Sequence, residues 1–246
     1  MMLNHLDLFS GIGGFALAAR WAGLKTMQFV ENEPYAQKVL KKNFPDVPIH
    51  EDIKDFKADE FPRPFLCTFG YPCQPFSHSG IRRGNKDDRH LWPEAFRIVQ
   101  ECRPDWVLGE NVTGHISMGI DEVLSDLEGE GYSCRAFHIG AVAVNAPHRR
   151  MRIFIVGNSN RKSLDSLHDE GSSKGSKETS SEESIHAGNS GFTDSGRIID
   201  ASCLSKSGVG RVAHGVPSRV DRLRGLGNAV VPRLAYEIIL RIKECR

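Results

Sequence analysis

The sequence contains no Cys-x-x-Cys pair, because its six cysteines are scattered along the chain. They stand at Cys67, Cys73, Cys102, Cys134, Cys203 and Cys245. This spacing argues against a zinc knuckle and against a disulfide framework. A reducing compartment fits it best, so we expect the protein in the cytoplasm.

An excess of charge of one sign is also absent. Lys and Arg total 32 against 31 for Asp and Glu, which gives a net charge of +1 and no overall electrostatic case for nucleic acid. Any basic surface must therefore be local. At the N-terminus, Asp7 and Arg20 interrupt the apolar residues. Neither a signal peptide nor a membrane span is predicted there.

Short apolar runs alternate with segments of helical spacing through the first two thirds of the chain. Buried strands are predicted at His5–Phe9, Thr26–Val30, Phe65–Phe69, Trp106–Leu108 and Arg152–Val156. Helices are predicted at Gly14–Trp21, Pro34–Asn43, Leu91–Glu101 and Ile120–Glu128. This alternation predicts an α/β fold with a doubly wound, mostly parallel sheet.

A Ser-, Gly- and charge-rich stretch interrupts this pattern at about Asn158. We interpret residues 158–208 as a small irregular insert, a loop or a partly disordered segment. It separates a main domain, residues 1–157, from a C-terminal segment, residues 209–246, that returns to it. The apolar spacing over Asn228–Lys243 predicts a last helix with one buried face.

A glycine-rich turn between the first strand and the first helix is the first candidate ligand site. Glycines allow close backbone approach, and a helix N-terminus offers free N–H groups. Glu31 and Asp52 follow the next two expected strands, where an acid can bind ribose hydroxyls. A tight turn without ligand and simple helix caps are the alternatives. The chain has no Gly-Lys-Ser/Thr loop, so adenosine is favoured over a nucleoside triphosphate.

Cys73 is the candidate nucleophile, since prolines at 72 and 75 stiffen the turn that presents it after the fourth strand. The other five cysteines are interpreted as small buried hydrophobes. Glu110 should emerge at the same sheet edge after the fifth strand. Arg150 and Arg152 would share one face if extended. Asn228 opens the last expected helix, as a cap or as a ligand contact.

Taken in order, these segments resemble the motif set of the cytosine-5 DNA methyltransferase family. Five motifs carry the resemblance: Asp-Leu-Phe-Ser-Gly-Ile-Gly-Gly, Pro-Cys-Gln, Glu-Asn-Val, Arg-Arg-x-Arg and Gly-Asn-Ala-Val. It covers residues 5–157 and 209–243. The resemblance implies a Rossmann-like methyltransferase fold, with the insert as a short target-recognition region, and S-adenosylmethionine as cofactor. The cofactor contacts that it implies are Phe9, Ser10, Gly11, Ile12, Gly13, Gly14, Glu31, Asn32, Asp52, Ile53, Pro72, Leu91 and Asn228.

The resemblance also implies a covalent mechanism that needs no metal. Cys73 would attack carbon 6 of a flipped cytosine, and Glu110 would hold ring nitrogen 3 and the exocyclic amine. Arg150 and Arg152 would contact the base carbonyl and support Glu110 or the phosphate backbone. Residues 76–90 would form a loop that closes over DNA. The nucleic-acid contacts expected around it are Gln74, Ser77, Arg82, Arg83 and Lys86.

The expected substrate is double-stranded DNA in a bacterial or phage-infected cell, and the expected form is a monomer. A cognate restriction endonuclease acting separately is one partner that the family implies. Two alternatives stay open: a cytosine-5 methyltransferase acting on tRNA, and a weakly active relative that binds cofactor or DNA with a truncated recognition region. His148 stands where the family often has Gln, and the insert is short and poor in aromatic residues.

Overall fold

The computed structural model describes residues 2–72, 91–117, 119–159 and 219–246. Within them, seven strands form one sheet in the order β3-β2-β1-β4-β5-β7-β6. The strands are β1 (Leu3–Leu8), β2 (Leu24–Val30), β3 (Ile49–His50), β4 (Leu66–Phe69), β5 (Trp106–Val112), β6 (Ser133–Gly140) and β7 (Met151–Asn158). The first five are parallel, whereas β7 runs antiparallel to both of its neighbours. The predicted α/β fold with a mostly parallel sheet is confirmed.

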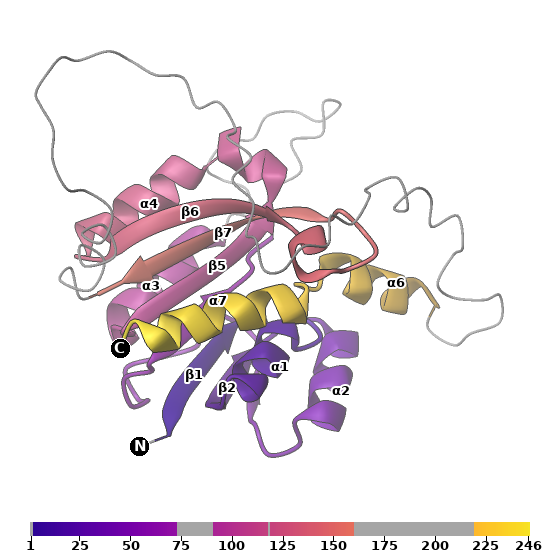
Figure 1. Cartoon of the computed structure of the whole chain (residues 1–246). Coiled ribbons are helices and arrows are strands. Elements are labelled where there is room, and N and C mark those ends of the chain that lie inside the picture. The colour runs from indigo at the N-terminus through magenta and orange to yellow at the C-terminus, as the bar shows by residue number, and fades with distance from the viewer. Residues whose placement is uncertain (1, 73–90, 118, 160–218) are drawn as a thin grey trace, which may run out of the picture.

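Helices cover both faces of the sheet (Figure 1). The helices with described bounds are α1 (Gly14–Trp21), α2 (Pro34–Asn43), α3 (Trp92–Cys102), α4 (Ile120–Gly129), α6 (Arg219–Asn228) and α7 (Pro232–Glu244). In Figure 1, α7 crosses in front of the strands, and α3 lies behind them. One apolar core joins α1 and α7 to the near face, and a second joins α3 and α4 to the other. The chain thus folds as a doubly wound layer structure.

The strand order reverses between β1 and β4, which are neighbours although β2 and β3 intervene in sequence. At such a switch point the loops after the two strands diverge to opposite faces, and a crevice forms at the carboxyl ends of the strands. The glycine-rich turn after β1 and the segment that follows β4 both begin there. This is where a ligand site is expected on topology alone.

Four predicted helices agree closely with the structure because their local signals are strong. For α2, Glu33 is the N-cap residue, and its carboxylate accepts a hydrogen bond of 2.6 Å from the backbone N–H of Ala36. Pro34 occupies the first turn, where its missing N–H leaves no donor unsatisfied. Among the described residues, no helix is long and apolar enough to cross a membrane.

Edge strand β6 is the main element that the sequence did not predict. Residues 135–138 are exposed, so no apolar run or alternation marks the strand. Its pairing with β7 alone defines it. Strand β5 also continues past the predicted end at Leu108, since the next four residues pair with β7.

The C-terminal region differs from the predicted single helix. Helix α7 confirms the predicted last helix but begins at Pro232, and a further helix, α6, which was not predicted, ends at Asn228. Pro232 explains the break, because its ring would clash with the carbonyl of residue 228 in a continuous helix and its nitrogen carries no hydrogen. The N-cap of α7 is Val231. The prediction that Asn228 caps the last helix was therefore wrong.

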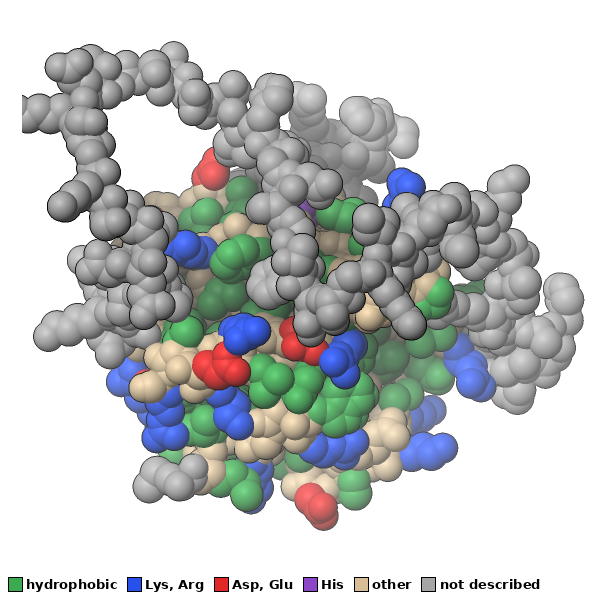
Figure 2. Space-filling model, viewed as in Figure 1, with side chains coloured by type: hydrophobic (Ala, Val, Ile, Leu, Met, Phe, Trp, Pro, Cys, Tyr) green, Lys and Arg blue, Asp and Glu red, His purple; other side chains and the backbone are tan. Residues whose placement is uncertain are grey.

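The surface on the side shown in Figure 2 carries no single-sign region among the described residues. Lys and Arg side chains lie there in small groups between apolar and neutral surface, with fewer Asp and Glu.

A buried polar network crosses the centre of the sheet beneath the glycine turn. Thr68 donates a hydrogen bond of 2.6 Å to Asp7 Oδ1, so its oxygen must accept from His5 Nε2, 2.8 Å away. Nδ1 of His5 then accepts from Thr26 Oγ1 at 2.9 Å. Burial lowers the pKa of His5 to about 3, and the imidazole is neutral. Burial likewise raises the pKa of Asp7 to about 8, with the charge of Glu31 adding to the rise and the Thr68 bond opposing it.

The buried carboxyl of Asp7 predicts a pH dependence of stability. Its folded pKa lies above the ordinary value of 3.8, so the stability it contributes is complete below about pH 4 and is lost as the pH rises through about 8. Asp7→Asn is a neutral isostere that keeps the Thr68 bond. The free energy of unfolding of the wild type, relative to the variant, should fall by up to about 1.4 kcal/mol per pH unit in that window. Denaturant titrations from about pH 5 to 8 test this, and parallel curves for the two proteins would contradict it.

Candidate active site

The glycine turn after β1 adopts a conformation that requires glycine. Gly13 has φ 86° and is the N-cap of α1. A Cβ built on it would lie 2.8 Å from a ring carbon of Phe44. At Gly14, a Cβ would come within 2.6 Å of the side chain of Val230. The turn therefore packs closely against the end of α2 and against the segment before α7.

Glu31 ties the end of β2 to this turn. Its side chain is largely buried, and its carboxylate accepts backbone hydrogen bonds from Gly11 at 2.6 Å and from Glu33 at 2.8 Å. Burial raises the pKa of Glu31, whereas those two N–H groups lower it. A Cβ on Gly11 would meet nothing within 4 Å, so open space adjoins the carboxylate. An acid fixed beside such space fits the ribose hydroxyls of an adenosine-type cofactor.

Apolar residues line the neighbouring part of the edge. Phe9, at φ 53°, and Leu91 are partly buried and pack on the core cluster that contains Ile53. Ser10 is buried, and its hydroxyl donates to the carbonyl of Asp7 at 2.7 Å. Phe9 and Leu91 thus pack against the same extended apolar cluster to which Ile53 belongs.

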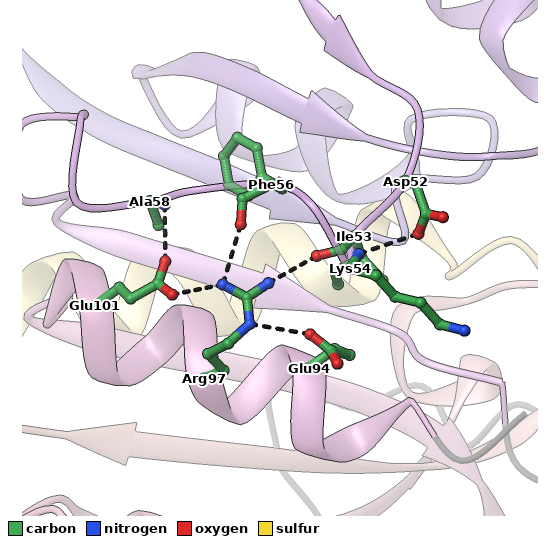
Figure 3. Close-up of polar contacts among 8 residues, drawn as sticks. All are labelled: Asp52, Ile53, Lys54, Phe56, Ala58, Glu94, Arg97 and Glu101. Atoms are coloured by element: carbon green, nitrogen blue, oxygen red, sulfur yellow. Dashed lines mark hydrogen bonds and ion pairs between the residues drawn. The ribbon is translucent and has the colours of Figure 1, made fainter. Parts of the chain in front are cut away.

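The polar cofactor candidates Asn32 and Asp52 are exposed. Asp52 accepts a hydrogen bond of 3.0 Å from the backbone of Lys54, as in an Asx-type turn (Figure 3). Pro72 is exposed as well, at the end of the described segment that follows β4.

Glu110 lies within β5, near its carboxyl end, and not after the strand as predicted. Its Oε1 is 2.8 Å from Nε of Arg152 on β7, in an ion pair whose side chains are only 10% and 19% exposed. Burial raises the pKa of Glu110, and Arg152 and Arg150 oppose this rise. A Cβ on Gly70 would be 3.9 Å from a Glu110 carboxylate oxygen, so the carboxylate adjoins the segment after β4.

Arg150 is not extended, so the condition under which it would share one face with Arg152 is not met. It precedes the strand and has φ 31°, in the left-handed region. Its guanidinium donates to the carbonyls of Gly227 at 2.7 Å and Ala229 at 2.5 Å. The two arginines therefore differ in their contacts: one holds Glu110, and the other holds the junction between α6 and α7.

Asn228 lies between the two carbonyls that Arg150 holds, and it is exposed. Nearby, a Cβ on Gly225 would be 3.2 Å from the side chain of Ile12 in the glycine turn. The C-terminal segment is thus adjacent to the glycine turn. A cofactor contact by Asn228 would need this proximity.

Six candidate residues lie outside the described part of the chain. They are the nucleophile and the five expected nucleic-acid contacts, namely Cys73, Gln74, Ser77, Arg82, Arg83 and Lys86. Their roles stay predictions.

One pair at the site was missed by the sequence reasoning. The hydroxyl of Tyr71 is 2.7 Å from Nε2 of His115, and both side chains are buried. The backbone carbonyl of Tyr71 accepts from Asn111 Nδ2 at 3.4 Å. These contacts join the segment after β4 to the strand that carries Glu110. A histidine five residues after Glu110 was the available signal.

The arrangement has defined chemical capabilities. A buried carboxyl with a raised pKa can hold a proton and donate it to a ring nitrogen, and a paired arginine fixes its orientation. The turn and the acid at Glu31 lie at the same edge and suit a nucleoside-containing cofactor. In open α/β sheets, ligands bind at the switch point between strands, which is where the glycine turn begins.

Comparison with known proteins gives the same picture. The sequence model for C-5 cytosine-specific DNA methylase matches residues 3–200. Type II methyltransferase M.DsaV of Dactylococcopsis salina is 34% identical over 169 residues, which cover 66% of this chain and 48% of that protein. Type II methyltransferase M.HhaI of Haemophilus parahaemolyticus is 35% identical over 159 residues, or 63% of this chain and 48% of that protein.

A solved structure is similar to this chain over about two thirds of its residues. It is a putative DNA modification methyltransferase encoded within a prophage of E. coli, with 30% identity and a TM-score of 0.56 over 66% of this chain and 48% of that one. The chain spans about half the length of the relatives it matches. Because the family match covers most of its residues, the chain belongs to the C-5 cytosine-specific DNA methylase family.

Proposed function

We propose that the chain is an S-adenosylmethionine-dependent DNA (cytosine-5)-methyltransferase that acts through a covalent bond between Cys73 and cytosine. The observation that carries the proposal is the position of Glu110. It is buried, paired with Arg152 and adjacent to Gly70, three residues before Cys73 in sequence. A proton donor and a thiol would then meet at one sheet edge.

The residues of the cofactor edge fit S-adenosylmethionine. Glu31 would bind the ribose hydroxyls, and the turn from Ser10 to Gly14 would accommodate the methionine part. Phe9 and Ile53 would enclose the adenine, with Asp52 near its amine. Asn32, Pro72, Leu91 and Asn228 would complete the contacts. When bound, the cofactor supplies an electrophilic methyl group on a sulfonium.

The protein's groups would activate the target base. The base must leave the stack, since carbon 6 is inaccessible within the duplex. The thiolate of Cys73 forms a bond to carbon 6, while Glu110 donates its proton to ring nitrogen 3, so that negative charge does not accumulate on the ring. Carbon 5 then takes the methyl group and a base removes the proton from carbon 5. Breakage of the bond to sulfur releases the thiolate, and ring nitrogen 3 returns its proton to Glu110. Arg152 keeps the Glu110 carboxyl oriented throughout.

Double-stranded DNA is the proposed substrate. Gln74, Ser77, Arg82, Arg83 and Lys86 would contact it, with the three cations forming a local basic patch at phosphates. Residues 158–208 would contribute target recognition. The curated relatives named above are type II methyltransferases, and a separately acting restriction endonuclease is the partner proposed for this chain.

Transfer of tritium from labelled S-adenosylmethionine tests this function. The wild type is incubated with unmethylated genomic DNA and, separately, with tRNA, and the nucleic acid is digested to nucleosides. Label in 5-methyldeoxycytidine is the expected result. Label in tRNA alone would replace DNA by RNA as substrate, and label in neither would overturn the proposed enzyme activity.

A further inference from the structure

Arg97 of α3 joins that helix to the segment between β3 and β4. Its Nη2 donates to the carbonyl of Ile53 at 2.8 Å, and its Nη1 donates to the carbonyl of Phe56 at 3.0 Å (Figure 3). These carbonyls belong to a stretch of turns that has no strand pairing of its own. One side chain thus satisfies two backbone acceptors of that segment.

Two acidic residues of the same helix hold the guanidinium in place. Glu94, one turn before it, accepts from Nε at 2.9 Å, and Glu101, one turn after it, accepts from Nη1 at 2.5 Å. The second oxygen of Glu101 accepts from the backbone N–H of Ala58 at 2.9 Å. Three backbone groups between residues 53 and 58 are therefore bound to α3 through Arg97 and Glu101.

The network needs an arginine in particular. Only a planar guanidinium has donors in several fixed directions, whereas a lysine ammonium is a single point on a flexible stem. The three side chains are 25–33% exposed, which leaves the ion pairs partly shielded from water. The side chains of Ile53, Phe56 and Ala58 are buried in the core cluster beside α3. These apolar side chains fix the position of the segment 53–58 on the core, and Arg97 fixes the orientation of its backbone.

We propose that Arg97 is a positioning residue for the cofactor, because it locks the segment that carries Asp52 and Ile53 to α3. This inference rests on the proposed function, in which those two residues contact the adenine. Helix α3 begins directly after Leu91, another proposed cofactor contact. Arg97 therefore fixes two separate parts of the adenine side relative to each other.

Arg97→Met tests the role, since methionine keeps an unbranched apolar stem without donors. The dissociation constant for S-adenosylmethionine, measured by calorimetry without DNA, should rise by about tenfold or more, because two backbone acceptors lose their charged donor. KM for the cofactor should rise in parallel, while kcat at saturating cofactor stays within about twofold. Arg97→Lys keeps a charge between the two acids but cannot reach all partners, so it should fall between wild type and Arg97→Met.

Arg103→Met is the matched control. Arg103 lies at the C-cap of the same helix, where it pairs with Glu130 at 2.7 Å on a largely exposed surface. It should leave cofactor binding unchanged. A wild type that binds no S-adenosylmethionine would overturn the proposed function and this role together. The role of Arg97 alone would be overturned by a different result. In that result the wild type binds S-adenosylmethionine, and Arg97→Lys and any folded Arg97→Met bind it with the same affinity as the wild type. Equal losses of kcat and affinity would also overturn it, since they indicate general damage.

Discussion

Replacement of Cys73 by alanine is expected to abolish methyl transfer to DNA and leave the affinity for S-adenosylmethionine unchanged. The reason is chemical: carbon 5 of cytosine becomes nucleophilic when a thiolate adds to carbon 6, and alanine offers no atom that could form this bond. The cofactor contacts proposed here come from other residues. Tritium transfer and calorimetry on the same preparations measure the two properties.

A matched cysteine distinguishes loss of the nucleophile from general damage. Cys245 follows α7 and is half-buried, far in sequence from the motifs. Cys245→Ala should keep wild-type transfer. Transfer by Cys73→Ala at a rate near that of the wild type would exclude Cys73 as the nucleophile, whatever the family resemblance implies.

Glu110→Gln should lower kcat by about 10²–10⁴-fold, the range expected for loss of a positioned proton donor. Glutamine has the same shape, but its amide cannot transfer a proton to ring nitrogen 3. Burial raises the pKa of Glu110, which favours the protonated carboxyl relative to a solvated glutamate. Since the residue makes no proposed cofactor contact, the affinity for S-adenosylmethionine should stay near the wild-type value.

Glu128→Gln serves as the control for this substitution, because Glu128 is an exposed residue of α4. It should be indistinguishable from wild type in transfer. Single-turnover rates at saturating cofactor make the comparison, so that slow product release does not conceal the chemical step. A Glu110→Gln rate within about threefold of wild type would contradict a proton-donor role.

The parts of the fold that were predictable have strong local signals. Strand β7 contains the apolar run Ile153–Val156, and α2 has both a capping acid and a proline at its start. The order of these elements implied the parallel sheet. The glycine turn, Glu31 and Glu110 could then be assigned to one edge, since parallel strands end together.

The elements that were missed depend on contacts absent from local sequence. Strand β6 has exposed residues on both faces and is defined by its pairing with β7. Helix α6 exposes its apolar residues, so its spacing gave no sign of a buried face: Val220, Leu223 and Leu226 are 76%, 42% and 49% exposed. Arg150 and Arg152 would share one face only if both were extended, yet Arg150 has φ 31° and binds the carbonyls before α7.

Site residues that act through others were equally hidden. Arg97 looks like an ordinary surface residue of an amphipathic helix, and its contacts with Ile53 and Phe56 span more than forty positions in sequence. The Tyr71–His115 pair spans 44 positions. Such contacts join elements that are far apart in sequence, which periodicity alone does not reveal.

Covalent trapping on DNA that contains 5-fluorocytosine tests the central claim most directly. Fluorine at carbon 5 cannot leave as a proton does, so the bond between Cys73 and carbon 6 should persist once the methyl group has been transferred. With S-adenosylmethionine present, wild-type protein should form a complex with this DNA that survives denaturation, and Cys73→Ala should form none. Absence of the complex with an enzyme that methylates ordinary DNA, or its persistence in Cys73→Ala, would contradict covalent catalysis by Cys73.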